Sequence, residues 1–174
     1  RMSPDYRRIP AAAVAALPVE GLFGSDAIMH LWVPNALIEE GLMVLRAWGF
    51  EPKTNTAWGK VARSYVDGEV RFHFGGGHYT RGAHELALLG VRGRPKVTDR
   101  GLASIFLASR PPPPPGQRKT HSAKPVDLHL LAERLSEGPR LELFAREARP
   151  RWRTFGNQIR RSTRRSQSSS EVTR

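Results

Sequence analysis

The sequence predicts an α/β fold with a mostly parallel sheet, because apolar strand-like runs alternate with stretches of helical periodicity. Its 174 residues, of which 39% are hydrophobic, suffice for one domain with a core but hardly for two. We therefore expect one domain over residues 1–159. A tail over 160–174 follows, rich in arginine and serine, and we expect it to be disordered.

Local patterns predict the first elements of this fold. A short helix is expected after Pro10, since AAAVAALP begins behind one proline and ends at another. The run IMHLWV, at 28–33, is typical of a buried strand. The segment at 36–49 has helical periodicity, with Gly49 as its C-terminal cap. Its apolar face is expected to contain Leu37, Gly41, Val44, Leu45 and Trp48.

The second half of the chain continues the alternation. We expect short strands at TNTAW, HELALLGV, SIFLAS and LELF. A helix is expected from Pro125 to Leu135, with leucines along one side. The glycine-rich segment at 60–81 fits neither regular structure, and PPPPP at 111–115 predicts a stiff surface connector.

The charge predicts a polyanionic partner. The formal net charge is +12, and spread Lys and Arg residues attract nucleic-acid phosphates. The alternative is that some of this charge only keeps the protein soluble. The absence of cysteine excludes disulfides, thiolate nucleophiles and cysteine-based zinc sites. No apolar run approaches the roughly 18 residues of a membrane span, and we expect a soluble, cytoplasmic protein without membrane contact.

The block GHYTRGAHE, at 77–85, is the candidate substrate element. An aromatic ring, a guanidinium and a carboxylate beside glycines could stack on, grip and orient a displaced base. Tyr79, Arg81 and Glu85 are therefore candidate substrate-binding residues. The alternative is a loop in which the tyrosine packs inward and the arginine and glutamate only pair with each other.

Three other patterns favour structural roles. The histidines have no regular ligand spacing, which disfavours a metal site. Trp32, Trp48 and Trp58 lie on expected strands or helix faces and are expected in the core. The triplet GGG at 75–77 is not followed by Lys-Ser or Lys-Thr, which disfavours a phosphate-binding P-loop.

The segment LELFAREARPRWRTFGNQI, at 141–159, places arginines and two side-chain amides after a strand. Ligands of α/β sheets bind outside the carboxyl ends of the strands. Asn157 and Gln158 can each donate and accept hydrogen bonds, as paired hydroxyls require. The segment therefore predicts a polar ligand where the strand ends.

A set of blocks in this order resembles the MT-A family of adenine-N6 methyltransferases, with bacterial and phage relatives. The resemblance covers residues 2–159. Its blocks are HLWVPN, AWGF, AWGK, GHYTRGAHELALLGVRG, HSAKP, ERLSEGPRLELFAR and FGNQ. Each block alone is weak, whereas their joint order and spacing are specific.

The resemblance implies a Rossmann-like class I methyltransferase fold, with helices on both faces of the sheet, that uses S-adenosylmethionine. The family's Asp-Pro-Pro-Trp motif lies upstream of a segment like the one that begins here at Arg1. We therefore expect the fold to be incomplete at its N-terminus, and no catalytic residue is assigned.

The resemblance also implies a cofactor site. By position in the family's blocks, its candidate residues are Lys124, Glu142, Arg146, Asn157 and Gln158. Where many relatives have Gly-Trp-Asp-x-Trp, this chain has Arg-Trp-Arg-Thr-Phe, so the aromatic and acidic positions differ. Ala148 and Arg149 replace polar cofactor contacts of eukaryotic relatives, which leaves those two contacts in doubt.

Two functions of different classes stay open. The first is transfer of a methyl group from S-adenosylmethionine to adenine N6 in nucleic acid, with DNA favoured over RNA. The second is a noncatalytic nucleic-acid-binding relative, or an inactive fragment, that lacks the catalytic motif. A homodimer and a heterodimer are both compatible with either reading, and a basic protein unrelated to methyl transfer would need the block matches to be coincidence.

Overall fold

The computed structural model describes residues 9–62, 69–112, 123–157 and 159. The chain divides into two compact units, of which the first ends at Glu137 and the second begins at Gly138. Each unit has its own sheet. The tail at 160–174 and most of the proline run lie outside the described residues, and so does Gln158.

The described elements match most of the expected ones. The helix after Pro10, the strands and the helix that ends at Leu135 are confirmed, with shifted ends. The strand expected at TNTAW is longer than predicted, since it begins at Glu51 and continues to Val61. In chain order the elements are α1 (Ala11–Ala15), η1 (Glu20–Leu22), β1 (Ala27–Val33), η2 (Asn35–Leu37), α2 (Ile38–Ala47), β2 (Glu51–Val61), β3 (His84–Arg92), β4 (Ile105–Ser109), α3 (Asp127–Leu135), β5 (Arg140–Leu143) and β6 (Trp152–Phe155).

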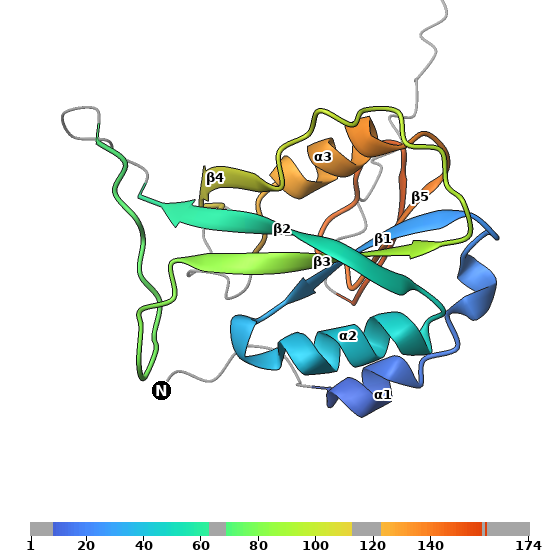
Figure 1. Cartoon of the computed structure of the whole chain (residues 1–174), viewed down its shortest axis with the longest axis horizontal. Coiled ribbons are helices and arrows are strands. Elements are labelled where there is room, and N and C mark those ends of the chain that lie inside the picture. The colour runs from blue at the N-terminus through green and yellow to red at the C-terminus, as the bar shows by residue number, and fades with distance from the viewer. Residues whose placement is uncertain (1–8, 63–68, 113–122, 158, 160–174) are drawn as a thin grey trace, which may run out of the picture. The chain divides into compact units, whose positions relative to one another are not determined.

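The sheet of the first unit has the strand order β1-β3-β2-β4 (Figure 1). The α/β class is confirmed, and three of the four strands, β1, β2 and β4, run in the same direction. The exception is β3, which lies between β1 and β2 and pairs antiparallel with both, so β2 and β4 are the parallel neighbours of this sheet. The cause is the link between β2 and β3: it has no described helix to cross over the sheet, so β3 returns beside β2 in the opposite direction.

Helix α2 covers one face of this sheet. Its buried residues include Val44 and Leu45, and Gly41 lies against Val33 of β1 and Leu88 of β3. The helix ends as predicted, because Gly49 has φ +79°, which glycine adopts without strain. Leu37 was expected on the apolar face of this helix, but it belongs to η2 and is 44% exposed.

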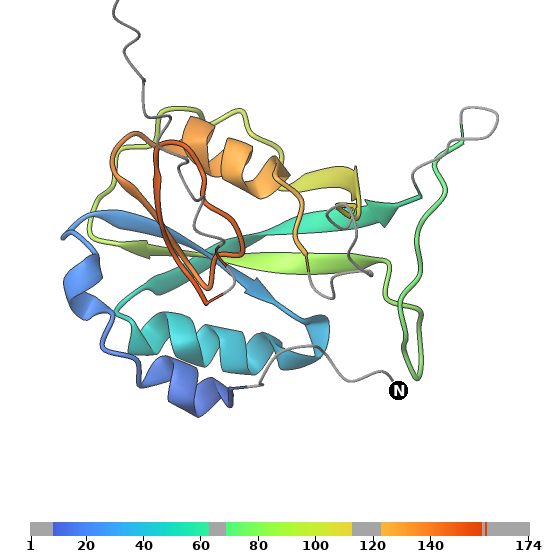
Figure 2. The ribbon, with the colours of Figure 1, turned by 180° about the vertical axis from the view of Figure 1, so that it is seen from behind.

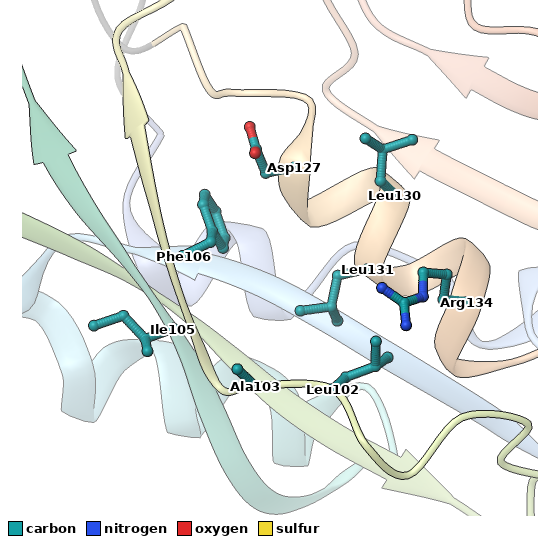
Figure 3. Close-up of a pocket in the computed structure, with 8 residues that line it drawn as sticks. All are labelled: Leu102, Ala103, Ile105, Phe106, Asp127, Leu130, Leu131 and Arg134. Carbon is teal, nitrogen blue, oxygen red and sulfur yellow. The ribbon is translucent and has the colours of Figure 1, made fainter.

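Helix α3 lies on the opposite side of the sheet from α1 and α2 (Figure 2). Val33 of β1 packs against Gly41 of α2. Because successive side chains of a strand point to opposite faces, its neighbour Trp32 faces away from α2. A pocket of about 220 Å³ lies between β4 and α3 (Figure 3). It is lined by Leu102, Ala103, Ile105, Phe106, Asp127, Leu130, Leu131 and Arg134.

The second unit contains a two-stranded parallel sheet. Strand β5 confirms the expected LELF strand, whereas β6 was not predicted, because its sequence WRTF has no apolar pattern and only its pairing with β5 makes it a strand. Beyond the strands, the N–H of Ala145 donates to the carbonyl of Phe155 at 2.9 Å. Gly156 packs against the backbone of Ala145, where a Cβ atom would collide. The carboxyl ends of β5 and β6 are therefore held side by side.

Candidate functional site

A cluster of three charged side chains lies in the first unit. Lys60 is near the end of β2, Glu85 is the second residue of β3, and Lys124 precedes α3. Lys60 Nζ lies 2.7 Å from Glu85 Oε1. Lys124 Nζ donates to the other carboxylate oxygen, Glu85 Oε2. We call these three residues the Lys–Glu–Lys cluster.

The strand pairing explains how distant residues meet. Trp58 of β2 is opposite Glu85 of β3, and Lys60 follows Trp58 by two residues on the same face. A diagonal neighbour in a sheet is within reach of a long side chain. Lys124 completes the arrangement from the segment that leads into α3.

Burial sets the electrostatics of the cluster. The side chain of Lys60 is 7% exposed, and those of Glu85 and Lys124 are 23% and 27% exposed. Burial by itself would raise the pKa of Glu85, but the ammonium groups of Lys124 and Lys60 more than offset this and hold that pKa below its usual value. Glu85 therefore stays ionised at neutral pH and accepts hydrogen bonds from both lysines.

Two tryptophans lie beneath the lysines. The rings of Trp32 and Trp58 meet edge to face, with centroids 6.1 Å apart. Lys60 Nζ lies 5.5 Å from the Trp58 ring centroid, and Lys124 Nζ lies 5.4 Å from that of Trp32, so each ammonium interacts with an aromatic face. Trp58 Nε1 also donates to the Ala108 carbonyl at 2.8 Å.

The expectation that the tryptophans belong to the core is confirmed for two of them. Trp48 and Trp58 are buried. Trp32 is half-buried and has Lys124 over its ring. Trp32 therefore combines packing with contact to a charged residue of the cluster.

The cluster lies at the end of the sheet where β1 and β2, which run in the same direction on either side of β3, both end. Lys60 is the penultimate residue of β2, and β3 begins at this same end because it is antiparallel. At the end of β1, the side chains of Asn35 and His84 are hydrogen-bonded at 3.0 Å. Carboxyl ends of strands are the usual ligand positions of α/β sheets.

The three candidate substrate residues lie in different settings. Glu85 is half-buried in the cluster, whereas Tyr79 is fully exposed. The Arg81 Nε donates to the carbonyl of Gly75 at 2.9 Å. The alternative in which Tyr79 packs inward is wrong, and Glu85 pairs with two lysines. The substrate role of the three residues stays a prediction.

The five candidate cofactor residues are divided between the two units. Lys124 belongs to the first unit, where it contacts Glu85, a candidate for a different role. Glu142 lies on β5 opposite Thr154, and Arg146 is half-buried just beyond that strand. Asn157 is exposed in the turn after β6, and Gln158 lies outside the described residues.

Sequence reasoning missed Lys60 as a functional residue. The available signal was its position two residues after Trp58, on the same face of the strand and within the otherwise apolar run AWGKV that ends it. A lysine at a buried strand position needs a carboxylate partner. Only the register between β2 and β3 identifies that partner as Glu85.

Metal sites and membrane spans are two other classes of feature. Within the ranges that the structure describes, no group of three or more His, Asp or Glu side chains could hold a metal ion. The described helices include none that is long and apolar enough to cross a membrane.

Comparison with known proteins gives the family. The MT-A70 family profile matches residues 4–158. A Drosophila melanogaster protein named N(6)-adenosine-methyltransferase MT-A70-like protein is 32% identical over 164 residues, covering 91% of this chain and 24% of that protein. The Danio rerio N(6)-adenosine-methyltransferase subunit METTL3 is 31% identical over 140 residues, covering 77% of this chain and 22% of that protein.

A Mus musculus protein with a differently named activity is also similar. The N(6)-adenine-specific methyltransferase METTL4 is 27% identical over 172 residues, covering 91% of this chain and 34% of that protein. The chain thus spans no more than about a third of the length of these relatives. Because the family profile covers most of its residues, the chain belongs to the MT-A70 family.

Proposed function

We propose that this chain is part of an S-adenosylmethionine-dependent enzyme that methylates adenine N6 in nucleic acid, with DNA favoured over RNA. The observation that carries the proposal is the Lys–Glu–Lys cluster at the carboxyl ends of β1 and β2. The family membership supports it, since the relatives are named for N6-adenosine or N6-adenine methylation.

The cluster suits the reacting edge of adenine. That edge presents the N6 amino group, a donor, beside the ring nitrogen N1, an acceptor. The cluster presents a carboxylate, which only accepts, beside ammonium groups, which only donate. Glu85 is about a quarter exposed, so a base can donate a hydrogen bond to its carboxylate. We assign to Glu85 the binding and orientation of adenine.

Positioning is the chemical contribution that these residues can make. The lone pair of the N6 amine is delocalised into the ring, so the amine needs in-line placement and acceptors for its hydrogens. The sequence contains no Asp-Pro-Pro-Trp, and beyond Glu85, which accepts from the amine, we assign no residue of this chain to the acceptor role. Tyr79 and Arg81, in the connection to β3, are proposed to contact the substrate beyond the base.

The second unit is proposed to hold the cofactor. S-adenosylmethionine supplies a sulfonium methyl group when bound, and its other parts present a carboxylate and two ribose hydroxyls. Arg146 follows β5 and Asn157 follows β6, so the parallel pairing places a guanidinium and an amide beyond adjacent strand ends. These donors fit a carboxylate and a hydroxyl. Gln158 and Glu142 complete the proposed set of this unit, and Lys124, in the first unit, is the fifth proposed cofactor residue.

Cofactor binding is tested by calorimetric titration of S-adenosylmethionine. We expect binding by the chain, or by a version extended upstream, and its loss in the Asn157→Ala, Gln158→Ala double variant. The control is Arg153→Gln, an exposed residue on β6 of the same unit. If neither length of chain binds although both are folded, the proposed cofactor site is wrong.

Methyl transfer is tested with radiolabelled S-adenosylmethionine and matched DNA and RNA oligonucleotides. We expect label in oligonucleotides that contain adenine and none where purine, which lacks the amino group, replaces it. The Glu85→Gln variant should lose transfer while still binding cofactor. Nucleic-acid binding without transfer by every length of chain would instead favour the noncatalytic relative.

Two further properties are part of the proposal. We infer that the chain works beside a second polypeptide, identical or different, because the zebrafish relative is named a subunit. Analytical ultracentrifugation of the chain, alone and after co-expression with the products of the adjacent genes, tests this. We also propose a cytoplasmic location, which cell fractionation with an antibody to the chain would check.

A further inference from the structure

The connection between β3 and β4 carries a second group of positive charges. Its exposed basic residues are Arg94, Lys96 and Arg100, which we call the distal basic loop. The loop follows Arg92, the last residue of β3, whereas Glu85 lies near that strand's first residue. The eight steps between the first and last of its nine residues, at about 3.4 Å each, make β3 roughly 27 Å long. The loop and the Lys–Glu–Lys cluster are therefore at opposite ends of the sheet.

The backbone at the start of this loop is held in place. Gly93 has φ +62° and lies directly against Ser25 and Asp26, where no side chain would fit. The N–H of Arg94 donates to Asp26 Oδ1 at 2.6 Å. The base of the Arg94 side chain is thus fixed relative to the start of β1.

The far part of the loop is tied to the end of α3. The N–H of Thr98 donates to the Leu135 carbonyl at 2.8 Å, and its hydroxyl donates to the Arg134 carbonyl at 2.6 Å. Arg134 also pairs with Asp99 at 2.6 Å. Lys96 and Arg100 therefore project from a segment that is anchored on both sides, and little backbone entropy would be lost on binding.

The nearby carboxylates are already engaged. Asp26 accepts from the Arg94 N–H and the Ser25 hydroxyl, and Asp99 accepts from the Gly101 N–H and from Arg134. These hydrogen bonds lower the pKa of both carboxyl groups. Glu20 pairs with Arg92 in the same way. Across the described residues, no carboxylate pairs with the side chains of the distal basic loop, which is made up of Arg94, Lys96 and Arg100.

We propose that the distal basic loop binds the phosphate backbone of the nucleic acid, at the end of the sheet opposite the base-binding cluster. Exposed cations spread along an anchored segment match a row of phosphates and are poorly suited to one small anion, which needs converging donors. The inference rests on the proposed function for the position of the base. At 3.4 Å per base pair, a duplex in contact with both places must extend about eight base pairs from the target base.

Fluorescence anisotropy with a duplex of about 20 base pairs tests the loop. A central target base then has at least about eight base pairs on each side, which is enough to reach the loop in either direction. The test variant is Arg94→Gln, Lys96→Gln. The matched control is Arg46→Gln, Lys53→Gln, which removes the same charge from exposed residues of α2 and β2. DNA and RNA versions of the duplex, and the corresponding single strands, are measured in parallel.

We expect the test variant to bind the duplex at least about tenfold more weakly than the control at roughly 50 mM salt. The slope of log K against log salt should fall in magnitude by about 1.8, since each lost phosphate contact contributes about 0.9. Equal affinities of the test and control variants, or no binding of any oligonucleotide by the unaltered chain, would overturn the proposal. Tighter binding to phosphatidylserine vesicles than to the duplex, lost in the test variant, would assign the loop to a membrane surface instead.

Calorimetry of S-adenosylmethionine on the same variants separates this inference from the proposed function. Cofactor binding should not change in either double variant, because none of the substituted residues belongs to the proposed cofactor set, of which four of the five members lie in the second unit. If the test variant binds nucleic acid as tightly as the control and also transfers methyl groups, the loop proposal fails and the enzyme proposal stands.

Discussion

Lys60 Nζ lies 2.7 Å from Glu85 Oε1 although only 7% of the lysine side chain is exposed. A buried ammonium is costly unless a carboxylate and aromatic faces replace its hydration, and Glu85 and Trp58 supply both. Because Glu85 also binds Lys124, the cluster carries one positive charge in excess. Removing these charges from water costs free energy that their attraction barely offsets, so the cluster adds little to stability. It is therefore a candidate for function.

Glu85→Gln should destabilise the chain by about 2 to 3 kcal/mol, because it leaves Lys60 buried without its counter-charge. The pKa of Glu85 is lowered on folding, so its contribution is present above the unfolded-state value of about 4.3 and is lost as pH falls through the folded value. Urea unfolding at pH 7 and at pH 3 measures this. Glu69→Gln, at an exposed position, is the control. Equal midpoints for the two variants at pH 7 would contradict the prediction.

Lys124→Met should raise the pKa of Glu85 above its value in the unaltered chain, since the charge of Lys124 is the strongest of the influences that lower it. Lys60→Met should raise it less. Carbon-13 NMR titration of the glutamate carboxyl groups gives the order directly. A larger rise in the Lys60 variant would mean that the deeper lysine dominates the cluster.

His30, on β1, makes stability depend on pH. Burial, with a smaller effect of the charge on His129, lowers the pKa of His30 to about 4. The unfolded chain has a value near 6.5 and binds the proton more readily, so stability is lost as pH falls from 6.5 towards 4. The loss amounts to roughly 3 kcal/mol at most. It should disappear in His30→Leu and persist in the control His78→Leu, where the histidine is exposed. Thermal melts between pH 4 and 8 give the two profiles.

Gly41→Ala should destabilise the first unit by about 1 to 3 kcal/mol. A Cβ atom there would lie 2.9 Å from Val33 Cγ2 and 3.0 Å from Leu88 Cδ1, which is too close for carbon atoms. The matched control is Gly21→Ala, because nothing lies within 4 Å of its Cβ position. A Gly41 variant that melts at the temperature of the control would show that α2 can move away from the sheet at little cost.

Local sequence determined most of the elements and little of their arrangement. The period of the apolar residues predicted α2 and β1, and Gly49 marked the helix end, because each depends on residues near in the chain. The direction of β3 depends on which edge it pairs with, and the alternation of strands and helices does not encode that choice. Strand β6 was missed because its pairing with β5, and not its composition, makes it a strand.

The candidate site divides in the same way. Glu85 and Lys124 were singled out from the sequence, but for two different roles, because nothing local links residues 39 positions apart. Lys60 was not singled out at all, since a lysine in a strand looks like surface charge until the opposite strand is known. The sequence by itself determined the family blocks, the basic charge and the residue types of the site. Only the tertiary structure decided that Lys60, Glu85 and Lys124 form one cluster, because side-chain contacts across a sheet follow from register and packing.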